Sequence, residues 1–204
     1  MNVAVRTPLM TREQFFFWAQ ARDERYEFDG FQPVAMTGVN LRHNVIVLNI
    51  HVALRHRLKG SGCRPLGPDA GVATIGDIVR YPDGVVTCSP ITGDEYLTPN
   101  VVVVFEVISP TSGRIDRIVK VREYAAVASI LRYVILESSS VGLTVMDRQA
   151  GDQKWTATTL LADETLLLPE IGVEIPVAAL YEGVDFPGSD ADAAAPGISA
   201  PPSA

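Results

Sequence analysis

The sequence predicts an α/β (α+β) domain in which helices flank a mixed central β-sheet, and three observations favour this fold class. Residues 100–109, NVVVVFEVIS, form a continuous β-branched run of the kind found in the middle of a sheet covered on both faces. A helical segment at 114–129 and a second apolar run at 131–138 follow, which together predict a strand–helix–strand crossover. The chain has 204 residues, of which 47% are hydrophobic, so one domain with a sizeable core is expected.

A helix and a hairpin are predicted near the N-terminus. Within residues 9–24, Thr11 and Gln14 have the spacing of a capping box, which satisfies free N–H groups at the start of a helix. Residues 25–36, RYEFDGFQPVAM, contain two short strand-like runs around Asp29-Gly30, a strong hairpin signal.

A second helix is predicted for residues 41–58, because apolar side chains recur there at helical spacing. They form two rows, which are Val45, Leu48 and Val52, and Ile46, Ile50 and Ala53. Gly60 and Gly62 end this helix.

Short strand-like runs lie on both sides of the crossover. They are residues 71–74, 77–81 and 84–87 before it, and residues 142–149, 154–161 and 170–176 after it. The later three predict a C-terminal β-meander at the edge of the sheet. Residues 1–186 are assigned to one domain, and residues 187–204, which are rich in Pro, Ala, Ser and Gly, to a disordered tail.

Composition limits the compartment and the partners. No apolar run approaches the roughly 20 residues that span a bilayer, and no secretory signal is visible, so a cytoplasmic protein without membrane contact is expected. Cys63 and Cys88 have no metal-binding spacing and are expected as small, unbonded side chains in a reducing compartment. The net charge of -7 argues against broad nonspecific nucleic-acid binding but allows a local basic groove.

Two carboxylates define a candidate site. Glu106 interrupts the apolar central run, and a buried carboxylate requires either an ion pair with an arginine or a bound cation. Asp83 follows Pro82 and precedes Gly84, a typical turn sequence, between two strand-like runs. If the strands carrying Asp83 and Glu106 are neighbours, the two carboxylates lie side by side. With a lysine nearby, such a pair can support metal-dependent phosphodiester hydrolysis.

Five segments in this order resemble a known family: YEFDG (26–30), His43, YPD (81–83), FEVISPTS (105–112) and DRIVKVREY (116–124). The family is the putative restriction endonuclease family, widespread in bacteria, of the PD-(D/E)XK nuclease superfamily. The resemblance implies a restriction-endonuclease-like fold. It also implies that Asp83 and Glu106 bind Mg²⁺, or Mn²⁺ as a substitute, with the main-chain carbonyl of Val107 as a third ligand.

The resemblance further implies that the catalytic lysine comes from the following helix and is Lys120, since Ile108 occupies the position two residues after Glu106. Glu27 matches a further acidic catalytic position, and His43 and Asp116 are accessory. On a helical wheel, however, Lys120 lies away from an apolar face made of Ile115, Ile118, Val119 and Ala126. A surface ion pair with Asp116 at i,i+4 is therefore the alternative. His51 and His56 are expected to be structural.

Basic residues concentrate in two segments. Those predicted to contact nucleic acid are Arg42, Arg55, Arg57 and Lys59 in the first segment, and Arg114 and Arg117 in the second. They could line a groove for a phosphate backbone, and a solvated helix face is the other interpretation.

The function expected from these observations is Mg²⁺-dependent DNA endonuclease activity, with DNA as substrate and a homodimer as the form that cuts both strands. Two alternatives stay open, which are a catalytically inactive nuclease-fold binding module and a hydrolase of a small phosphorylated molecule. The stretch after the lysine helix, VASILRYVILESSS, lacks the glycine-rich turn and the Asp-Pro pair usual in the family. This departure concerns substrate or partner contacts more than the chemistry.

Overall fold

The fold is given by a computed structural model, which describes residues 9–108, 115–152 and 154–186, without the side chains of residues 115 and 116. The elements in chain order are α1 (Arg12–Ala19), β1 (Tyr26–Phe28), β2 (Pro33–Ala35), α2 (Leu41–Arg57), β3 (Arg64–Leu66), β4 (Val72–Ala73), β5 (Val79–Arg80), β6 (Gly84–Thr87), β7 (Val101–Ile108), the π-helical segment η1 (Ile115–Lys120), α3 (Val121–Ala125), β8 (Arg132–Glu137), β9 (Leu143–Asp147), β10 (Thr156–Leu160), β11 (Thr165–Leu168), the 3-10 segment η2 (Pro169–Ile171), β12 (Val173–Pro176) and α4 (Val177–Leu180).

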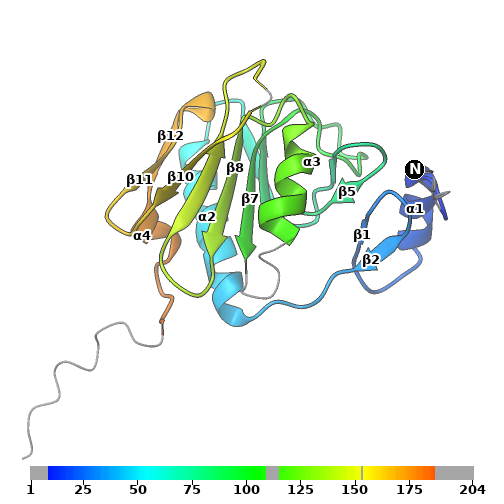
Figure 1. Ribbon diagram of the computed structural model, residues 1–204, viewed down its shortest axis with the longest axis horizontal. Helices are drawn as coiled ribbons and strands as arrows, with labels where there is room; N and C mark the ends of the chain where they lie inside the picture. Colours follow the sequence, from blue (N-terminus) through cyan, green and yellow to red (C-terminus); the bar gives the residue numbers. More distant parts are fainter. Residues whose placement is uncertain (1–8, 109–114, 153, 187–204) are drawn as a thin grey trace, which may run out of the picture.

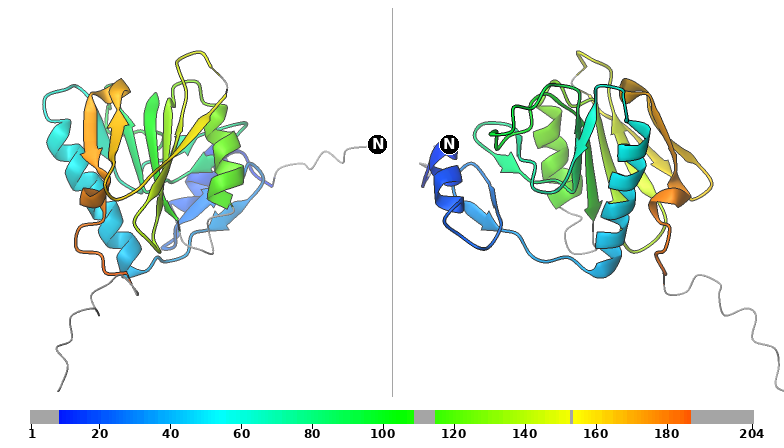
Figure 2. Two further views of the ribbon diagram at one scale, coloured as in Figure 1. Left: turned by 60° about the vertical axis from the view of Figure 1, so that its left-hand side comes forward. Right: turned by 180° about the vertical axis from the view of Figure 1, so that it is seen from behind.

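The central sheet is mixed and has the strand order β10-β9-β8-β7-β6-β3. β7 and β8 are parallel and are connected through η1 and α3, which confirms the predicted crossover, while the other pairs are antiparallel. α3 lies on one face of the sheet and α2 on the other (Figures 1 and 2). The apolar core under α2 also takes in β11, β12 and α4, whereas Tyr124 and Tyr133 dominate the core under α3.

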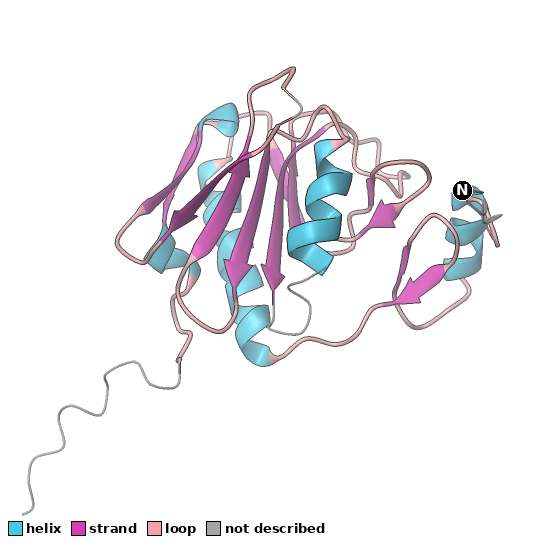
Figure 3. Ribbon diagram, in the orientation of Figure 1, coloured by secondary structure: helices cyan, strands magenta, loops and turns pink. Residues whose placement is uncertain are grey.

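The N-terminal elements form a smaller layer beside this sheet. β1 and β2 make the predicted hairpin, and together with β5 and β4 they form a second sheet of order β2-β1-β5-β4. The capping box at the start of α1 is present, since Thr11 and Gln14 each bond the other's main-chain N–H. Phe15 of α1 stacks on Phe28 of β1, which joins helix and hairpin. Figure 3 shows the loop that runs from β2 to α2 along the end of the sheet where β7 ends.

Three details of the predicted fold are wrong. The C-terminal meander ends at β10, because β11 and β12 pair only with each other in a separate two-stranded sheet. In α2 the row containing Leu48 and Val52 is exposed, at 56% and 69%, because only the row containing Ile46 and Ile50 faces the sheet. The helix after β7 ends at Ala125 instead of continuing to residue 129.

The expectation of unbonded cysteines is also wrong, because Cys63 and Cys88 form a disulfide. The cause is the antiparallel pairing of β3 with β6, which places Arg64 opposite Thr87 and so brings the two flanking cysteines together. Because the two cysteines are bonded to each other, they no longer support the expectation of a reducing compartment.

Among the described residues, no helix combines the length and apolar character needed to cross a bilayer.

Candidate active site

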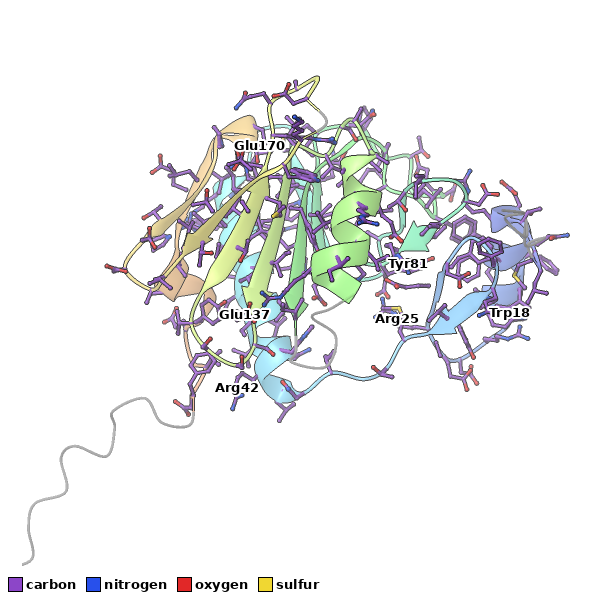
Figure 4. The ribbon with its side chains drawn as sticks, viewed as in Figure 1. Trp18, Arg25, Arg42, Tyr81, Glu137 and Glu170 are labelled. Carbon is purple, nitrogen blue, oxygen red and sulfur yellow. A yellow bond between two sulfur atoms is a disulfide. The ribbon has the colours of Figure 1, made fainter. Side chains whose placement is uncertain are left out.

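A cleft of about 230 Å³ opens at the carboxyl end of β7, between the central sheet and the hairpin of β1 and β2. The titratable side chains that line it come from five elements or turns, and they are Glu27, His43, Tyr81, Asp83, Glu106 and Lys120. Figure 4 shows Tyr81 between α3 and the hairpin, on the side of the molecule that carries this cleft. The cleft brings together four side chains predicted as catalytic, Glu27, Asp83, Glu106 and Lys120, with the accessory His43.

Asp83 is fixed by contacts at both its carboxylate and its main chain. Because Gly84 of β6 pairs with Phe105 of β7, Asp83 reaches the end of β7, where its Oδ2 accepts a hydrogen bond of 2.7 Å from the N–H of Val107. Its Oδ1 lies 3.0 Å from Nε2 of His43. Its main-chain oxygen lies 2.8 Å from Nε2 of His51.

Glycine at position 84 is needed for this arrangement. A Cβ there would lie 3.3 Å from Cε1 of His51, so a larger residue would push the imidazole away from the Asp83 main chain. His51 thus has a specific role beside Asp83 beyond the structural role expected from the sequence. The missed signal was its spacing from His43, since residues i and i+8 share one helix face.

Glu106 forms an ion pair with Lys120. Nζ of Lys120 lies 2.7 Å from Oε1 of Glu106, and both side chains are buried. The hydroxyl of Tyr124 donates to the same carboxylate oxygen at 3.2 Å. Burial, together with the charge of Glu106, raises the pKa of Tyr124 well above its ordinary value, so the hydroxyl remains a donor.

The predicted polar face of the lysine helix is therefore wrong. Lys120 is 7% exposed, whereas Ile118 and Val119, assigned to the apolar face, are 51% and 41% exposed. The physical reason is the π-helical geometry of η1, because a helical wheel with 3.6 residues per turn misplaces the side chains of a wider helix. Lys120, Glu123 and Tyr124 then lie on one buried face of η1 and α3. The side chain of Asp116, the alternative partner of Lys120, lies outside the described part of the chain.

Glu27 belongs to a second layer of ion pairs behind Lys120. Its Oε1 lies 3.6 Å from Nζ of Lys120 and accepts a hydrogen bond of 3.2 Å from the N–H of Tyr81. Its Oε2 accepts a hydrogen bond of 2.9 Å from Arg80, whose guanidinium also makes two hydrogen bonds of 2.7 Å to Glu123. Burial alone lowers the pKa of Arg80, but the hydrogen bonds to Glu123 and the two carboxylate charges outweigh it and raise that pKa.

Sequence reasoning missed Arg80, Glu123 and Tyr124. Glu123 and Tyr124 follow Lys120 at i+3 and i+4, a spacing that points to a shared helix face. Arg80 gives no such signal, because its partners lie 53 residues before it and 43 residues after it.

The charges around the cleft do not balance. Four carboxylates, Glu27, Asp83, Glu106 and Glu123, meet two cations, Arg80 and Lys120, which leaves two net negative charges among the described side chains when histidine is counted as neutral. Uncompensated charge in a poorly solvated site is costly. A divalent cation would balance the two charges.

The donor chemistry suits a hard divalent cation such as Mg²⁺. Asp83 and Glu106 supply carboxylate oxygens, and the N–H of Val107 faces Asp83, so the carbonyl of the same strand residue points to the same side. The described residues contain no group of three or more His, Cys, Asp and Glu side chains arranged to hold a metal. The predicted ligand set does not need one, because its third ligand is a main-chain oxygen.

The described basic residues among those predicted to contact nucleic acid do not line one groove. Arg42 lies over the ring of Phe186, and Arg117 pairs with Glu137; Figure 4 shows Arg42 and Glu137 near the end of the sheet at which the cleft opens. Arg55, Arg57 and Lys59 lie toward the other end of α2, roughly 18 Å or more along the helix from His43 at 1.5 Å per residue. Arg114 lies outside the described residues.

Comparisons with known proteins agree with this fold. Residues 12–178 match the family model described as "Uma2: Putative restriction endonuclease". An uncharacterized protein of Synechocystis sp. is 28% identical over 183 residues, which cover 88% of this chain and 95% of that protein. A crystal structure from Anabaena variabilis, described as a putative nuclease belonging to DUF820, superposes with a TM-score of 0.63 at 13% identity. The match covers 84% of this chain and 97% of that one, and at this identity it shows the shared fold alone.

Proposed function

The chain belongs to the Uma2 family, described as "Putative restriction endonuclease", and from this premise we propose that it is a Mg²⁺-dependent nuclease that hydrolyses phosphodiester bonds in DNA. The observation that carries the proposal is the meeting of Asp83, Glu106 and Lys120 in one cleft, where the described side chains carry an excess of two negative charges. A polyanionic substrate would be repelled by such a cleft unless a cation were bound there.

Asp83, Glu106 and the carbonyl of Val107 would hold the ion, and Mn²⁺ would substitute for Mg²⁺. When bound, such an ion polarises the scissile phosphate and lowers the pKa of a bound water. The N–H of Val107 and the imidazole of His43 orient the Asp83 carboxylate, and Tyr124 orients that of Glu106. These contacts fix both carboxylates before substrate arrives.

Lys120 would supply positive charge where negative charge develops on the phosphate or would orient the attacking water. Its position next to Glu106 keeps the ammonium at the ligand side of the cleft. Glu27, at 3.6 Å from Nζ, attracts the ammonium and limits its movement. Arg80 in turn holds Glu27, so it acts on the site through its neighbour.

The test is nicking and linearisation of supercoiled plasmid with Mg²⁺, with Mn²⁺ and with EDTA. We expect Asp83→Asn and Glu106→Gln to lower cleavage at least about 10²-fold, while Lys154→Ala, a change at an exposed residue, leaves it unchanged. Linear product appearing without a nicked intermediate would indicate a homodimer that cuts both strands together. Cleavage that survives both Asp83→Asn and Glu106→Gln would contradict the proposal.

A second candidate is hydrolysis of a small phosphorylated molecule. Two observations favour it, namely the modest size of the cleft and the engagement of Arg42 with Phe186 and of Arg117 with Glu137. Few of the described cations near the cleft are thus left for a long phosphate backbone. A panel of plasmid, single-stranded DNA, RNA and nucleotides separates the two, because the second candidate requires turnover of nucleotides alone.

A further inference from the structure

A second cavity lies at the opposite end of α2 from the catalytic cleft. It measures about 350 Å³, within the range of small-ligand sites. Its lining comes from the last turn of α2, the following turn and β3, and consists of Arg55, Leu58, Lys59, Cys63, Arg64 and Pro65. Neither the family description nor the catalytic cleft assigns a role to it.

The charge of this cavity is one-sided. Arg55, Lys59 and Arg64 line it together with no carboxylate, and none of the three forms an ion pair with another described residue. By contrast, Arg132 is paired with Glu170, and Arg57 donates to the main-chain oxygen of Glu174. Three cations with no ion pair among the described residues thus surround one cavity in a chain with a net charge of -7.

The helix dipole explains only part of this cluster. Cations are favoured near the C-terminus of a helix, which accounts for Arg55 and contributes to the placement of Lys59. Arg64 has no such reason, because it lies at the start of β3. Its approach to the other two adds repulsion that an anion would remove.

The floor of the cavity is apolar and held in place. Leu58 is buried, Pro65 pairs within the sheet opposite Val86, and Cys63 is joined to Cys88 of the neighbouring segment. The cations therefore surround a floor that does not need to rearrange on binding, which reduces the cost of binding. An anionic group with an attached apolar or planar part fits this combination.

We propose that this cavity binds a phosphate ester, with the phosphate held by Arg55, Lys59 and Arg64 and the organic part against Leu58 and Pro65. Arginine forks and the lysine ammonium are the usual protein partners of phosphate oxygens. The phosphate can belong to a free nucleotide or to the backbone of a nucleic-acid strand. The site is separate from the catalytic cleft, because most of the length of α2 lies between them.

Binding is measured by isothermal titration calorimetry on full-length Asp83→Asn protein at low ionic strength without divalent ions. The probes are inorganic phosphate, deoxyadenosine monophosphate and a 12-nucleotide single-stranded DNA. The variant Lys59→Glu/Arg64→Glu is compared with Arg12→Glu/Lys154→Glu, which makes the same change in net charge at two residues with no ion pair in the described structure. We expect the first pair to weaken binding at least about tenfold and the second less than twofold.

The outcomes separate the sources of the phosphate. Binding of phosphate and the mononucleotide alone assigns a free-nucleotide site, and binding of the oligonucleotide alone assigns a site for a strand. Either result supports the proposal when Lys59→Glu/Arg64→Glu loses the binding and Arg12→Glu/Lys154→Glu keeps it. Absence of binding by every probe, or equal weakening in both variants, overturns it. If circular dichroism shows that Lys59→Glu/Arg64→Glu is unfolded, Lys59→Gln/Arg64→Gln replaces it. Because no catalysis is measured, failure of the nuclease proposal leaves this result intact.

Discussion

Nζ of Lys120 lies 2.7 Å from Oε1 of Glu106, and this buried ion pair joins the π-helical segment η1 to the central strand β7. The two residues are 14 positions apart, on opposite sides of the connection that starts the crossover. The pair fixes the lysine at the ligand side of the cleft, and it also couples a proposed catalytic residue to the stability of the fold.

Replacing Lys120 by methionine separates these two roles. We expect turnover to fall about 10²–10³-fold. The free energy of unfolding without metal should fall by about 3 kcal/mol, because Glu106 is left as a buried charge without its cation. Mn²⁺ affinity, measured by calorimetry, should stay equal or increase, since the described side chains around the cleft then carry three net negative charges in place of two. A variant that loses metal binding and turnover together would contradict the catalytic role.

Asp83→Asn tests the metal site through stability. In the wild-type protein, 10 mM Mn²⁺ should raise the melting temperature, because a ligand that binds only the folded state stabilises it in proportion to the logarithm of its concentration over Kd. In the variant, the increase should largely disappear. Its melting temperature without metal should equal or exceed that of the wild type, since one of the crowded negative charges is gone. Asp69→Asn, at an exposed carboxylate, is the control and should retain the full increase.

The fold and the site could be predicted from the sequence to different extents. The β-branched run around Glu106 and the following helix and strand determine the crossover, because the period and composition of these segments are strong local signals. β11 was missed because three consecutive leucines, Leu166 to Leu168, hide the alternation of buried and exposed positions that the structure shows. Local signals cannot reveal how a non-standard helix turns its side chains, which is why Lys120 was placed on the wrong face.

Pairing between distant elements is the other part that the sequence does not specify. Asp83 and Glu106 could be matched because Asp83 directly precedes β6 and Glu106 lies in β7, the neighbouring strand of the same sheet. Arg80 could not be matched with Glu27 and Glu123, because nothing local distinguishes it from the other arginines of the chain. The contact of His51 with the main chain of Asp83 likewise depends on the packing of α2 against the sheet.

His51 is predicted to position Asp83 without touching substrate. His51→Leu removes a hydrogen bond to the main-chain oxygen of Asp83, and we expect Mn²⁺ binding to weaken about five- to tenfold, which corresponds to about 1 kcal/mol for a hydrogen bond. His51→Gln keeps an N–H donor at a similar distance from the helix and should restore most of the affinity. A role limited to packing predicts instead that Leu and Gln lower stability alike while metal affinity stays at the wild-type value.

Arg80 is predicted to stabilise the second layer of ion pairs, because it bonds both Glu27 and Glu123. Arg80→Met leaves Glu27 and Glu123 without their common cation, so the free energy of unfolding in urea should fall by about 3–5 kcal/mol. The double variant Arg80→Met/Glu123→Met should recover part of this loss, because it removes the Glu123 carboxylate that has lost both hydrogen bonds to Arg80, while Glu27 keeps Lys120 at 3.6 Å. The difference between the double variant and the sum of the single variants measures the coupling. Strict additivity would show that the ion pair does not contribute as the geometry indicates.

Tyr124 gives the site a dependence on alkaline pH. Burial and the charge of Glu106 raise the pKa of its hydroxyl well above the ordinary value of 10.0, so the folded protein keeps the proton while the unfolded chain loses it. The stabilisation is therefore complete below pH 10 and declines as pH rises above 10, by up to about 1.4 kcal/mol per pH unit. Tyr124→Phe cannot ionise, so its free energy of unfolding should fall less steeply between pH 10 and pH 11.5. Chemical denaturation across this range checks the slope. Tyr96→Phe, at an exposed tyrosine, should keep the wild-type slope, and a Tyr124→Phe slope equal to that of the wild type would contradict the assignment.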